Sequence, residues 1–374
     1  MITIGELQSL LDGHYPPRSA ESWDRVGLVT GDLGDAVQGV LLTVDVSDAV
    51  IQQAVDLGAN LIIAHHPLLL RGINAIDPRH PKGRMITKLI RSETGLITAH
   101  TNADIPAGGV SDSIADAFGL TGARPLRRVP VHPADQLVTY VPHDHTEAVI
   151  DALSAAGAGA VGAYDRAAFT ATGTGTFTPG PGAHPAIGQP SRREHVTEDL
   201  VEMIMDRRLR DRVITALLAA HPYEVPAYRL VEVATPADLG PTAGMGRIGH
   251  IEPTSLTGFA DRVAAVLPAT PAGIRIAGDP DRPISTVALQ GGAGDDLLDA
   301  ARAAGADVYV TSDLRHHPAS EAAGWDDAPA LIDVPHWAAE WLWLPRLADE
   351  LRPALDGIPV TISQIVTDPW SFRR

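Results

Sequence analysis

The sequence predicts an α/β protein with two related halves and a separate domain between them. Two observations carry this prediction. Both ends of the 374-residue chain alternate short apolar runs with amphipathic helical patterns, as βαβ units with a mostly parallel sheet do. The middle instead follows the order βαββαβ of ferredoxin-like folds. We therefore expect a duplicated α/β/α core domain formed by residues 1–127 and 244–374, with an inserted ferredoxin-like domain over 128–243.

The first segment contains two predicted βαβ steps. Residues 37–47 form an apolar strand, and 47–58 have helical periodicity between a Ser/Asp cap and a glycine. A buried strand over 59–67 follows. A helix over 83–95 then leads to the next predicted strand, 96–104. Strands in this order are expected to lie parallel to one another.

The last segment repeats the pattern. Residues 284–294 form a strand that runs into a Gly-rich turn, and 295–306 form a helix. Strands over 307–313 and 329–337 follow, and the chain after the last strand has helical periodicity. This segment therefore predicts a second α/β half.

The two halves share a short pattern, in which a helix is followed by a Gly-Ala turn and an apolar run. Aligning "AVDLGANLIIAHH" with "AARAAGADVYVTSD" places His65 and His66 opposite Ser312 and Asp313. Internal duplication explains this match. Any similar turn before a strand would also produce it, so duplication and a chance match both stay open.

The middle segment differs in composition and in the order of its elements. It contains a Gly- and Pro-rich loop and a return linker, here taken as 234–251. The expected elements, in chain order, are a strand at 136–142, a helix at 145–159, strands at 164–179 and 194–208, a helix at 209–226 and a last strand at 227–233.

Composition excludes several classes of protein. Cysteine is absent, so there are no disulfides or thiolate metal sites, and no apolar run approaches the roughly 20 residues of a membrane span. The N-terminus lacks the basic region of a signal peptide, so we expect a cytoplasmic protein without a membrane partner. A net charge of -17 argues against nucleic-acid binding as a function. With 15 histidines, any transition metal must be held by imidazole and carboxylate.

Several predicted strand ends carry side chains that bind metals. Ligands of open α/β sheets bind beyond the carboxyl ends of the strands, so these side chains should converge. Neighbouring strand-end histidines usually diverge, so each would bind a different ion, and two ions bridged by a carboxylate can activate water. The residues are His65 and His66, His100 and Asp104, the Thr-Ser-Asp sequence at 311–313, and the i,i+4 pair His336 and Glu340.

Each of these motifs also has a purely structural interpretation. The His pair could be a hydrogen-bonded turn, the i,i+4 pair a surface contact, and residues 100–104 an Asx-turn. Their joint occurrence favours the metal interpretation. "LQGGAGDD" (289–296) lacks the lysine of a phosphate loop and predicts a tight strand–helix turn. The second His pair, His316 and His317, lies beyond its strand and is expected near the mouth of the site.

Taken together, the motifs resemble the NIF-three-like family. Its members are dinuclear-metal-centre hexameric proteins, often labelled GTP cyclohydrolase 1 type 2 homologues. The resemblance covers essentially the whole chain, and the motifs follow the family's order. They are "ESWDRVGLVTGD" (21–32), "AHHPLLLRG" (64–72), "AHTNADIPAGGVSDSIAD" (99–116), "GMGRIGHI" (244–251), "GADVYVTSDLRHHPASEA" (305–322) and "LIDVPHWAAE" (331–340).

The resemblance implies two divalent metal ions per subunit and a toroidal homohexamer. Asp104 and Glu340 would be the shared or bridging carboxylates. Two positions depart from the family pattern: Ser312 replaces a common glycine, and Trp337 follows the histidine where Tyr or Phe is usual. Neither removes a ligand. The implied ligands are five of the side chains at these strand ends: His65, His66, Asp104, His336 and Glu340.

The middle domain also fits the resemblance, because longer family members carry an insertion of the CutA/PII type. "HPYEVPAY" (221–228) is similar to the CutA signature. Since CutA forms trimers, His221 and Glu224 are expected to serve packing or subunit contacts, with ligand binding as the alternative.

The first functional hypothesis is a metal-dependent hydrolase of a small molecule, with a nucleotide such as GTP as one candidate substrate. The ions would be Zn, Fe, Mn, Ni or Co. Candidates for proton transfer are Asp313, His316 and His317. No basic triphosphate cradle accompanies the motifs, and Arg71 and Arg315 are the nearest basic candidates.

The second hypothesis is a non-enzymatic metal-binding scaffold whose middle domain senses a ligand. Nucleic-acid binding inside a toroid is a third, disfavoured by the net charge of -17. It would need a local basic lining from 124–130 or 205–212.

Overall fold

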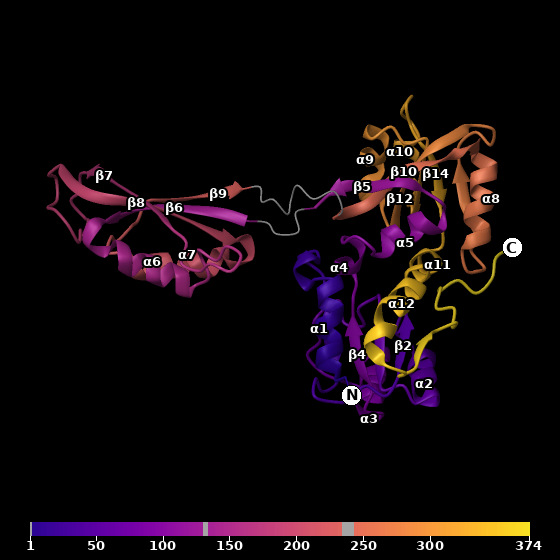
Figure 1. Cartoon of the computed structure of the whole chain (residues 1–374). Coiled ribbons are helices and arrows are strands. Elements are labelled where there is room, and N and C mark those ends of the chain that lie inside the picture. Colours follow the sequence, from indigo (N-terminus) through magenta and orange to yellow (C-terminus); the bar gives the residue numbers. More distant parts are fainter. Residues whose placement is uncertain (1, 130–133, 234–242) are drawn as a thin grey trace. The chain divides into compact units, whose positions relative to one another are not determined.

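The computed structural model describes residues 2–129, 134–233 and 243–374 of a mixed α/β fold with several sheets. The chain divides into two compact units (Figure 1). The core unit contains Met1–Val129 and Pro241–Arg374, and the middle unit contains Pro130–Gly240. The first part of the predicted return linker, 234–242, lies outside the described residues.

The first sheet of the core unit has five strands in the order β1-β4-β3-β2-β15. Its three central strands are parallel, as the βαβ pattern predicts, and β15 joins them in parallel beside β2. Strand β1 is antiparallel to β4 and was not predicted. The strands are β1 (Gly27–Thr30), β2 (Val40–Thr43), β3 (Leu61–Ala64), β4 (Gly95–Thr98) and β15 (Val360–Ile362).

The second sheet of the core unit has six strands in the order β11-β14-β13-β12-β10-β5. Strands β12, β13 and β14 are parallel, and antiparallel strands flank them on both sides. The strands are β5 (Thr121–Arg128), β10 (Gly244–Ser255), β11 (Arg275–Ala277), β12 (Pro283–Ala293), β13 (Val308–Ser312) and β14 (Ala330–Asp333).

Helices form the remaining layers of the core unit. One set shares an apolar core with both sheets; of this set, α5, α11 and α12 lie between the sheets in Figure 1. The set is α1 (Ile4–His14), α5 (Val110–Ala117), α8 (Leu256–Val266), α11 (His336–Trp341) and α12 (Trp343–Leu355). The outer faces of the sheets pack against α2 (Asp48–Leu57), α3 (Pro81–Arg91) and α9 (Leu298–Ala303).

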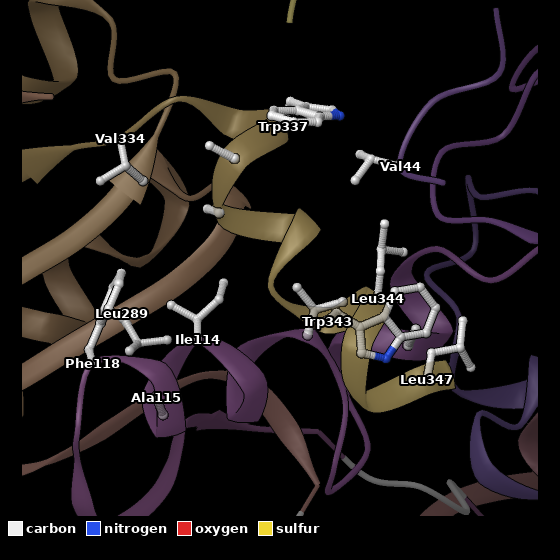
Figure 2. Packing of buried hydrophobic residues seen from close by; sticks show 14 of the residues in the cluster. Val44, Ile114, Ala115, Phe118, Leu289, Val334, Trp337, Trp343, Leu344 and Leu347 are labelled. Carbon is white, nitrogen blue, oxygen red and sulfur yellow. The ribbon is translucent and has the colours of Figure 1, made fainter. Parts of the chain in front are cut away.

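Trp343 is the largest fully buried side chain of the inner layer (Figure 2). Its indole N–H donates to the Tyr15 hydroxyl at 3.1 Å, and that hydroxyl donates to Glu350 at 2.6 Å. The polar edge of the tryptophan is therefore satisfied while its rings fill the core. Helix α12 is fixed in this way directly after α11, which carries predicted site residues.

The helix predicted over 47–58 is confirmed as α2. The Ser47 side chain accepts a hydrogen bond from Val50 N–H, and Gly58 ends the helix in the left-handed region with φ 67°. The strand predicted over 96–104 is wrong in its second half. Strand β4 ends at Thr98, and a single helical turn, α4 (Thr101–Asp104), follows.

The reason for this early strand end is a buried carboxylate from another part of the chain. Asp24 accepts hydrogen bonds from the N–H and hydroxyl of Thr101, at 3.0 and 2.5 Å. The side chain of Asn102 accepts from the His100 N–H at 2.9 Å. These contacts replace strand pairing and turn the chain, so Asp104 lies on a helical turn and not on a strand.

The middle unit is a four-stranded antiparallel sheet with two helices on one face. Strand order is β7-β8-β6-β9. The helix predicted over 209–226 ends earlier, at Ala220, because His221, which precedes a proline, is extended. The elements are β6 (Ala134–Pro142), α6 (Thr146–Ala155), β7 (Phe169–Phe177), β8 (Glu194–Asp206), α7 (Arg210–Ala220) and β9 (Tyr228–Val233).

A buried ion pair joins the inner helix layer to the second sheet. Arg247 on β10 is only 1% exposed and pairs with Asp112 on α5. Its guanidinium also donates to the carbonyls of Gly244 and Gly246, at 2.7 and 2.8 Å, and of Pro106 at 3.1 Å. The positive charge of Arg247 is thus compensated, and its N–H groups have hydrogen-bond acceptors, which is the condition for a stable buried ion.

We expect Arg247→Met to destabilise the core unit by about 3–5 kcal/mol, because it leaves the Asp112 carboxylate without its counter-ion. Arg352→Met is the matched control. Arg352 pairs with Asp349 on the surface with 52% of its side chain exposed, so its loss should cost less than about 1 kcal/mol. Urea unfolding followed by tryptophan fluorescence measures both. Equal effects for the two variants would contradict the assignment.

Candidate metal centre

Two adjacent histidines extend from the end of β3. Backbone N–H groups of His65 and His66 continue the pairing with β2 by donating to the carbonyls of Thr43 and Val44, at 3.0 and 2.8 Å. The hydrogen bonding to β2 therefore continues through both residues, although β3 itself ends at Ala64 and the chain bends there. The His65 side chain is fully buried, and its Nδ1 lies 2.8 Å from the carbonyl oxygen of Ala99. Since a carbonyl only accepts, Nδ1 carries the proton and Nε2 is left with a free lone pair.

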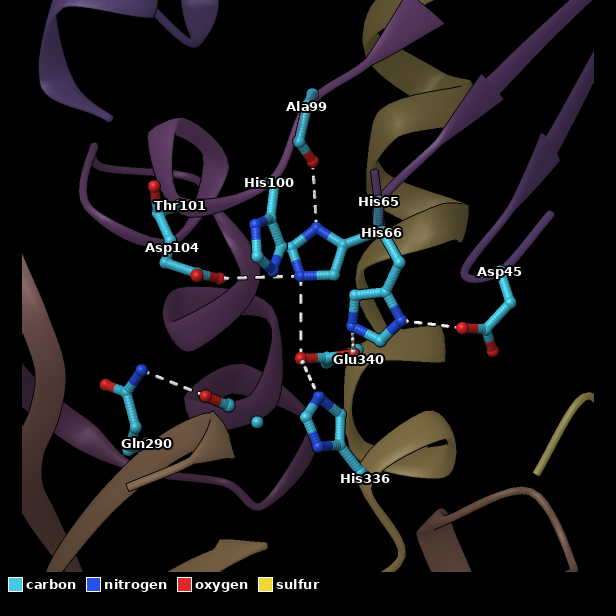
Figure 3. Close-up of polar contacts among 12 residues, drawn as sticks. Asp45, His65, His66, Ala99, His100, Thr101, Asp104, Gln290, His336 and Glu340 are labelled. Atoms are coloured by element: carbon cyan, nitrogen blue, oxygen red, sulfur yellow. Dashed lines mark hydrogen bonds and ion pairs between the residues drawn. The ribbon is translucent and has the colours of Figure 1, made fainter. Parts of the chain in front are cut away.

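The other end of the chain supplies a histidine and a carboxylate from α11. His336 and Glu340 lie one turn apart, with His336 Nε2 2.9 Å from Glu340 Oε1. Glu340 is 2% exposed. Its carboxylate also lies 2.8 Å from His66 Nε2 and 3.5 Å from His65 Nε2. The structure thus brings together residues separated by most of the sequence (Figure 3).

In the three imidazoles other than that of His65, the Nδ1 atom contacts a carboxylate. An oxygen partner on one ring nitrogen fixes the ring and directs the other nitrogen, which is the usual arrangement behind metal-binding histidines. The three pairs are His66 with Asp45 at 2.7 Å, His100 with Asp24 at 2.8 Å, and His336 with Asp313 at 2.7 Å.

Asp313 adopts an unusual backbone conformation to make its contact. Its φ is 58°, in the left-handed region, directly after β13. Aspartate tolerates this region better than most residues, although it is still disfavoured. The conformation brings the carboxylate to His336 while 60% of the Asp313 side chain stays exposed.

Three buried polar atoms of the cluster lack hydrogen-bond partners: His65 Nε2, Asp104 Oδ1 and Glu340 Oε2. The first two lie 3.8 Å apart. Buried polar groups are almost always paired, because an unpaired one loses its interaction with water. A cation between a free imidazole lone pair and a carboxylate oxygen would satisfy both atoms. The cluster therefore fits a metal ion by its geometry and by its donor types.

The backbone beside Glu340 is shaped to let the carboxylate approach. A Cβ atom on Gly292 would lie 2.7 Å from Glu340 Oε1 and 3.2 Å from His336 Nε2, and Gly292 has φ 70°. Only glycine fits both the space and the conformation. The "LQGGAGDD" motif thus contributes an uncrowded wall of the cluster.

His100 was not among the five residues selected from the sequence, although its strand end was noted. Its ligand nitrogen lies within 4.8 Å of those of His65 and His66. In a second group, the ligand atoms of His66, His336 and Glu340 also lie within 4.8 Å of one another. The spacing His100–Asp104 repeats the i,i+4 spacing of His336–Glu340, and this signal could have identified it. Asp24 and Asp45, the partners of two imidazoles, carried no such signal.

The charges of the cluster are strongly coupled. Burial alone would lower the pKa of His66 and His336, but the Glu340 carboxylate and hydrogen bonds to Asp45 and Asp313 raise them to about 10 and about 11. Burial followed by the charge of Glu340 raises the pKa of Asp104 from 3.8 to about 7. Without a cation, the cluster therefore holds protons that a cation would replace.

The remaining sequence candidates occupy different positions. Asp313 belongs to the cluster, whereas His316 and His317 are exposed on α10 (His316–Ala322). The centroids of their two rings lie 5.2 Å apart. Within the described residues, no contact joins either ring to the cluster. Arg315 pairs with Asp295, and Arg71 is exposed.

A cavity of about 530 Å³ opens beside the cluster. His66 and His336 form part of its wall, so the cluster is accessible to small molecules. The rest of the wall is formed by Asp45, Ala272, Gly273, Arg275, Asp313, Asp333, Val334, Pro335, Trp337 and residues 367–370.

The fold and the cluster define a class of protein: a mixed α/β chain with a buried histidine–carboxylate centre suited to cations. The model of the Duf34/NIF3 family (NGG1p interacting factor 3) matches residues 2–369. The chain therefore belongs to the DUF34/NIF3 family, and the resemblance seen in its sequence is confirmed.

Relatives and solved structures agree with this assignment. The "GTP cyclohydrolase 1 type 2 homolog" of Mycobacterium leprae is 45% identical over 372 residues, which cover 99% of this chain and 95% of the relative. A Bacillus cereus protein related to NIF3 has a TM-score of 0.68 and 35% identity, with 99% of both chains covered. Staphylococcus aureus protein SA1388 has a TM-score of 0.69 and 29% identity, covering 100% of this chain and 99% of that one.

We expect Asp104→Asn to stabilise the protein when chelator keeps it metal-free. An acid whose pKa is raised by folding binds a proton on folding, so its contribution to the free energy of unfolding falls as pH rises toward its folded pKa of about 7. At about 1.4 kcal/mol per pH unit, the variant should gain on the order of 4 kcal/mol at about pH 8 and less than half of that at about pH 5.

Urea unfolding with chelator at the two pH values measures this gain. The control is Asp349→Asn, on an exposed carboxylate, which should change little at either pH. A gain that does not depend on pH would contradict a buried, ionisable Asp104.

Proposed function

We propose that this chain binds two divalent metal ions in its histidine–carboxylate cluster and uses them to hydrolyse a small molecule. The observation that carries the proposal is the pair of unpartnered buried atoms, His65 Nε2 and Asp104 Oδ1, beside imidazoles whose Nδ1 atoms are already occupied. The names of the relatives, GTP cyclohydrolase 1 type 2 homologues, support a hydrolytic reaction and make GTP the first substrate to test.

The distances support a division of the ligands between two ions. His66, His336 and Glu340 would hold one ion, since their ligand atoms lie within 4.8 Å of one another. His65 and Asp104 would hold the other, with His100 as a further ligand. Glu340 faces both sets and would bridge them. This grouping adds His100 to the five ligands implied by the resemblance.

When bound, a pair of such ions lowers the pKa of a water molecule and stabilises negative charge that develops on the substrate. The chain's own residues orient the ligands: Asp45 holds His66, and Asp313 holds His336. Asp313 is also the candidate for accepting a proton, because it is exposed at the wall of the cavity. Imidazole and carboxylate suit Zn, Fe, Mn, Ni or Co.

A non-enzymatic metal-binding scaffold is the second candidate function. It is favoured by a large cavity in the middle unit, which lies away from any residue of the cluster in sequence. A scaffold would bind metal without turnover. Metal binding and hydrolysis must therefore be measured separately on the same variants.

The finer architecture is also part of the proposal. The orders β1-β4-β3-β2 and β11-β14-β13-β12 are the same arrangement of one antiparallel and three parallel strands, which supports a duplicated core domain. The pairing of β3 with β4 and that of β13 with β14 have equivalent registers. When these two registers are aligned, His65 and His66 correspond to Ser312 and Asp313.

The strand order of the middle unit, with its two helices, supports an inserted ferredoxin-like domain over 128–243 of CutA/PII type. The core domain would then comprise 1–127 and 244–374. A homohexamer and a cytoplasmic location stay predictions of the sequence. Within the described residues, no helix has the length and apolar character needed to cross a membrane.

We expect the purified chain, after loading, to contain about two divalent ions, one for each group of ligands. His65→Ala and His336→Ala should each remove about one ion or more, because each takes a nitrogen from a different group. His317→Ala is the matched control from the second His pair, which does not contact the cluster. Elemental analysis by mass spectrometry measures the content. Unchanged metal content in both variants would overturn the proposed site.

Hydrolysis is tested with the loaded protein on GTP, other nucleotides and phosphodiesters. Asp45→Asn should lower metal affinity by about 10–100-fold, because it loosens His66 without removing a ligand, and added metal should restore turnover. His65→Ala should abolish turnover at all metal concentrations. If fully loaded wild-type protein turns over no substrate of the panel, hydrolysis of these substrates is rejected and the scaffold function is favoured.

A further inference from the structure

A cavity lies in the middle unit, on the face of the sheet opposite its helices. It has a volume of about 720 Å³, the size of pockets that hold small organic ligands. Side chains alternate between the two faces of a strand. On β8, Val201 and Met203 pack in the core with the helices, whereas Glu198 and Leu200 line the cavity. The segments 178–187 and 223–227 supply further walls.

The lining is apolar and aromatic with two carboxylates. Phe177 and Tyr223 lie with ring centroids 5.5 Å apart, inclined at 66°. The charged residues that line the cavity are Glu198 and Glu224, and no Lys, Arg or His is among the described lining residues. Outside the lining, Arg229 donates to the hydroxyl of Tyr140 at 3.0 Å, and the His221 ring lies with its centroid 5.2 Å from that of Tyr223. The cavity therefore presents negative charge and aromatic faces to a ligand.

Glu198 is the buried polar group at this site. It is 9% exposed and accepts a hydrogen bond from the Tyr223 hydroxyl at 2.6 Å. Burial and the neighbouring carboxylate raise the pKa of Tyr223, which keeps the hydroxyl as the donor. A Cβ on Gly175 would lie 1.9 Å from Glu198 Oε2, so the glycine makes room for this carboxylate against the strand. The position of the negative charge is thus built into the sequence.

Gly173 leaves space within the same wall. It pairs with Glu198 across β7 and β8, and a Cβ atom there would meet no atom within 4 Å. A glycine in the interior of a strand weakens the strand and often marks the close approach of another group. Here it keeps part of the cavity next to the carboxylate empty.

We propose that this cavity binds a small organic cation, with its ammonium group at Glu198 and its apolar body against Phe177 and Tyr223. Carboxylate and aromatic faces together are the usual recognition elements for alkylammonium groups. A phosphorylated ligand is disfavoured, because its oxygens would face two carboxylates and no lining cation. The inference is independent of the hydrolytic function proposed for the core unit.

The probe is tryptamine, titrated into the full chain by isothermal calorimetry. Indole-3-acetate and tryptophol serve as anionic and neutral analogues with the same ring. We expect tryptamine to bind more tightly than tryptophol, and indole-3-acetate to bind least. Glu198→Gln should weaken tryptamine binding by about 10–100-fold and remove its advantage over tryptophol, because it removes the charge but little volume.

Further variants test whether tryptamine binds in this cavity and nowhere else on the chain. Gly173→Leu should block all three compounds by filling the cavity, and Glu202→Gln, on the same face of β8 but outside the lining, should change nothing. His65→Ala should also leave tryptamine binding intact, since it alters only the core unit.

Three results would overturn the inference. One is the absence of tryptamine binding to folded wild-type protein, and another is equal binding of all three compounds with no effect of Glu198→Gln. The third is a change in oligomeric state on Gly173→Leu, measured by sedimentation, without any amine binding to the wild type. That result would assign the face to contact with a second copy of the chain.

Discussion

The buried carboxylate of Glu340 is the constraint around which the core unit is organised. A charge that is 2% exposed must be compensated, because its loss of hydration is not otherwise recovered. The compensation comes from imidazoles at both ends of the chain, including His66 and His336. Helix α11 must therefore lie between the two sheets with its first turn at the end of β3. The strand ends and the position of the helix both meet this requirement.

The inner helix layer makes that convergence possible. Parallel strands end at the same edge of a sheet, so each sheet alone would present its strand-end residues to solvent. Trp343 and the chain of hydrogen bonds through Tyr15 fix α12 and thereby the register of α11. Arg247 and Asp112 attach α5 to the second sheet. Apolar packing and one buried ion pair thus set the distances on which the cluster depends.

The sequence was sufficient for the elements with strong periodicity and for residues with metal-binding side chains. Parallel strands β2 to β4 and the convergence of His65 with Glu340 could be predicted, because apolar runs and strand ends are local signals. The contacts that Asp24 and Asp45 make could not be predicted, because the imidazoles that they contact are distant in sequence. The helical turn at Asp104 was missed for the same reason: the contact that ends β4 comes from Asp24.

The charge around the cavity of the core unit limits what can bind there. Asp45, Asp313, Asp333 and Asp368 line it, and its guanidinium, Arg275, already pairs with Asp333. Three of these carboxylates are already paired, with His66, His336 and Arg275, so the described wall offers a triphosphate no unpaired cation. Bound metal ions would be its main source of positive charge. A nucleoside triphosphate therefore depends on bound metal ions for charge compensation at this wall, whereas a substrate with little negative charge does not.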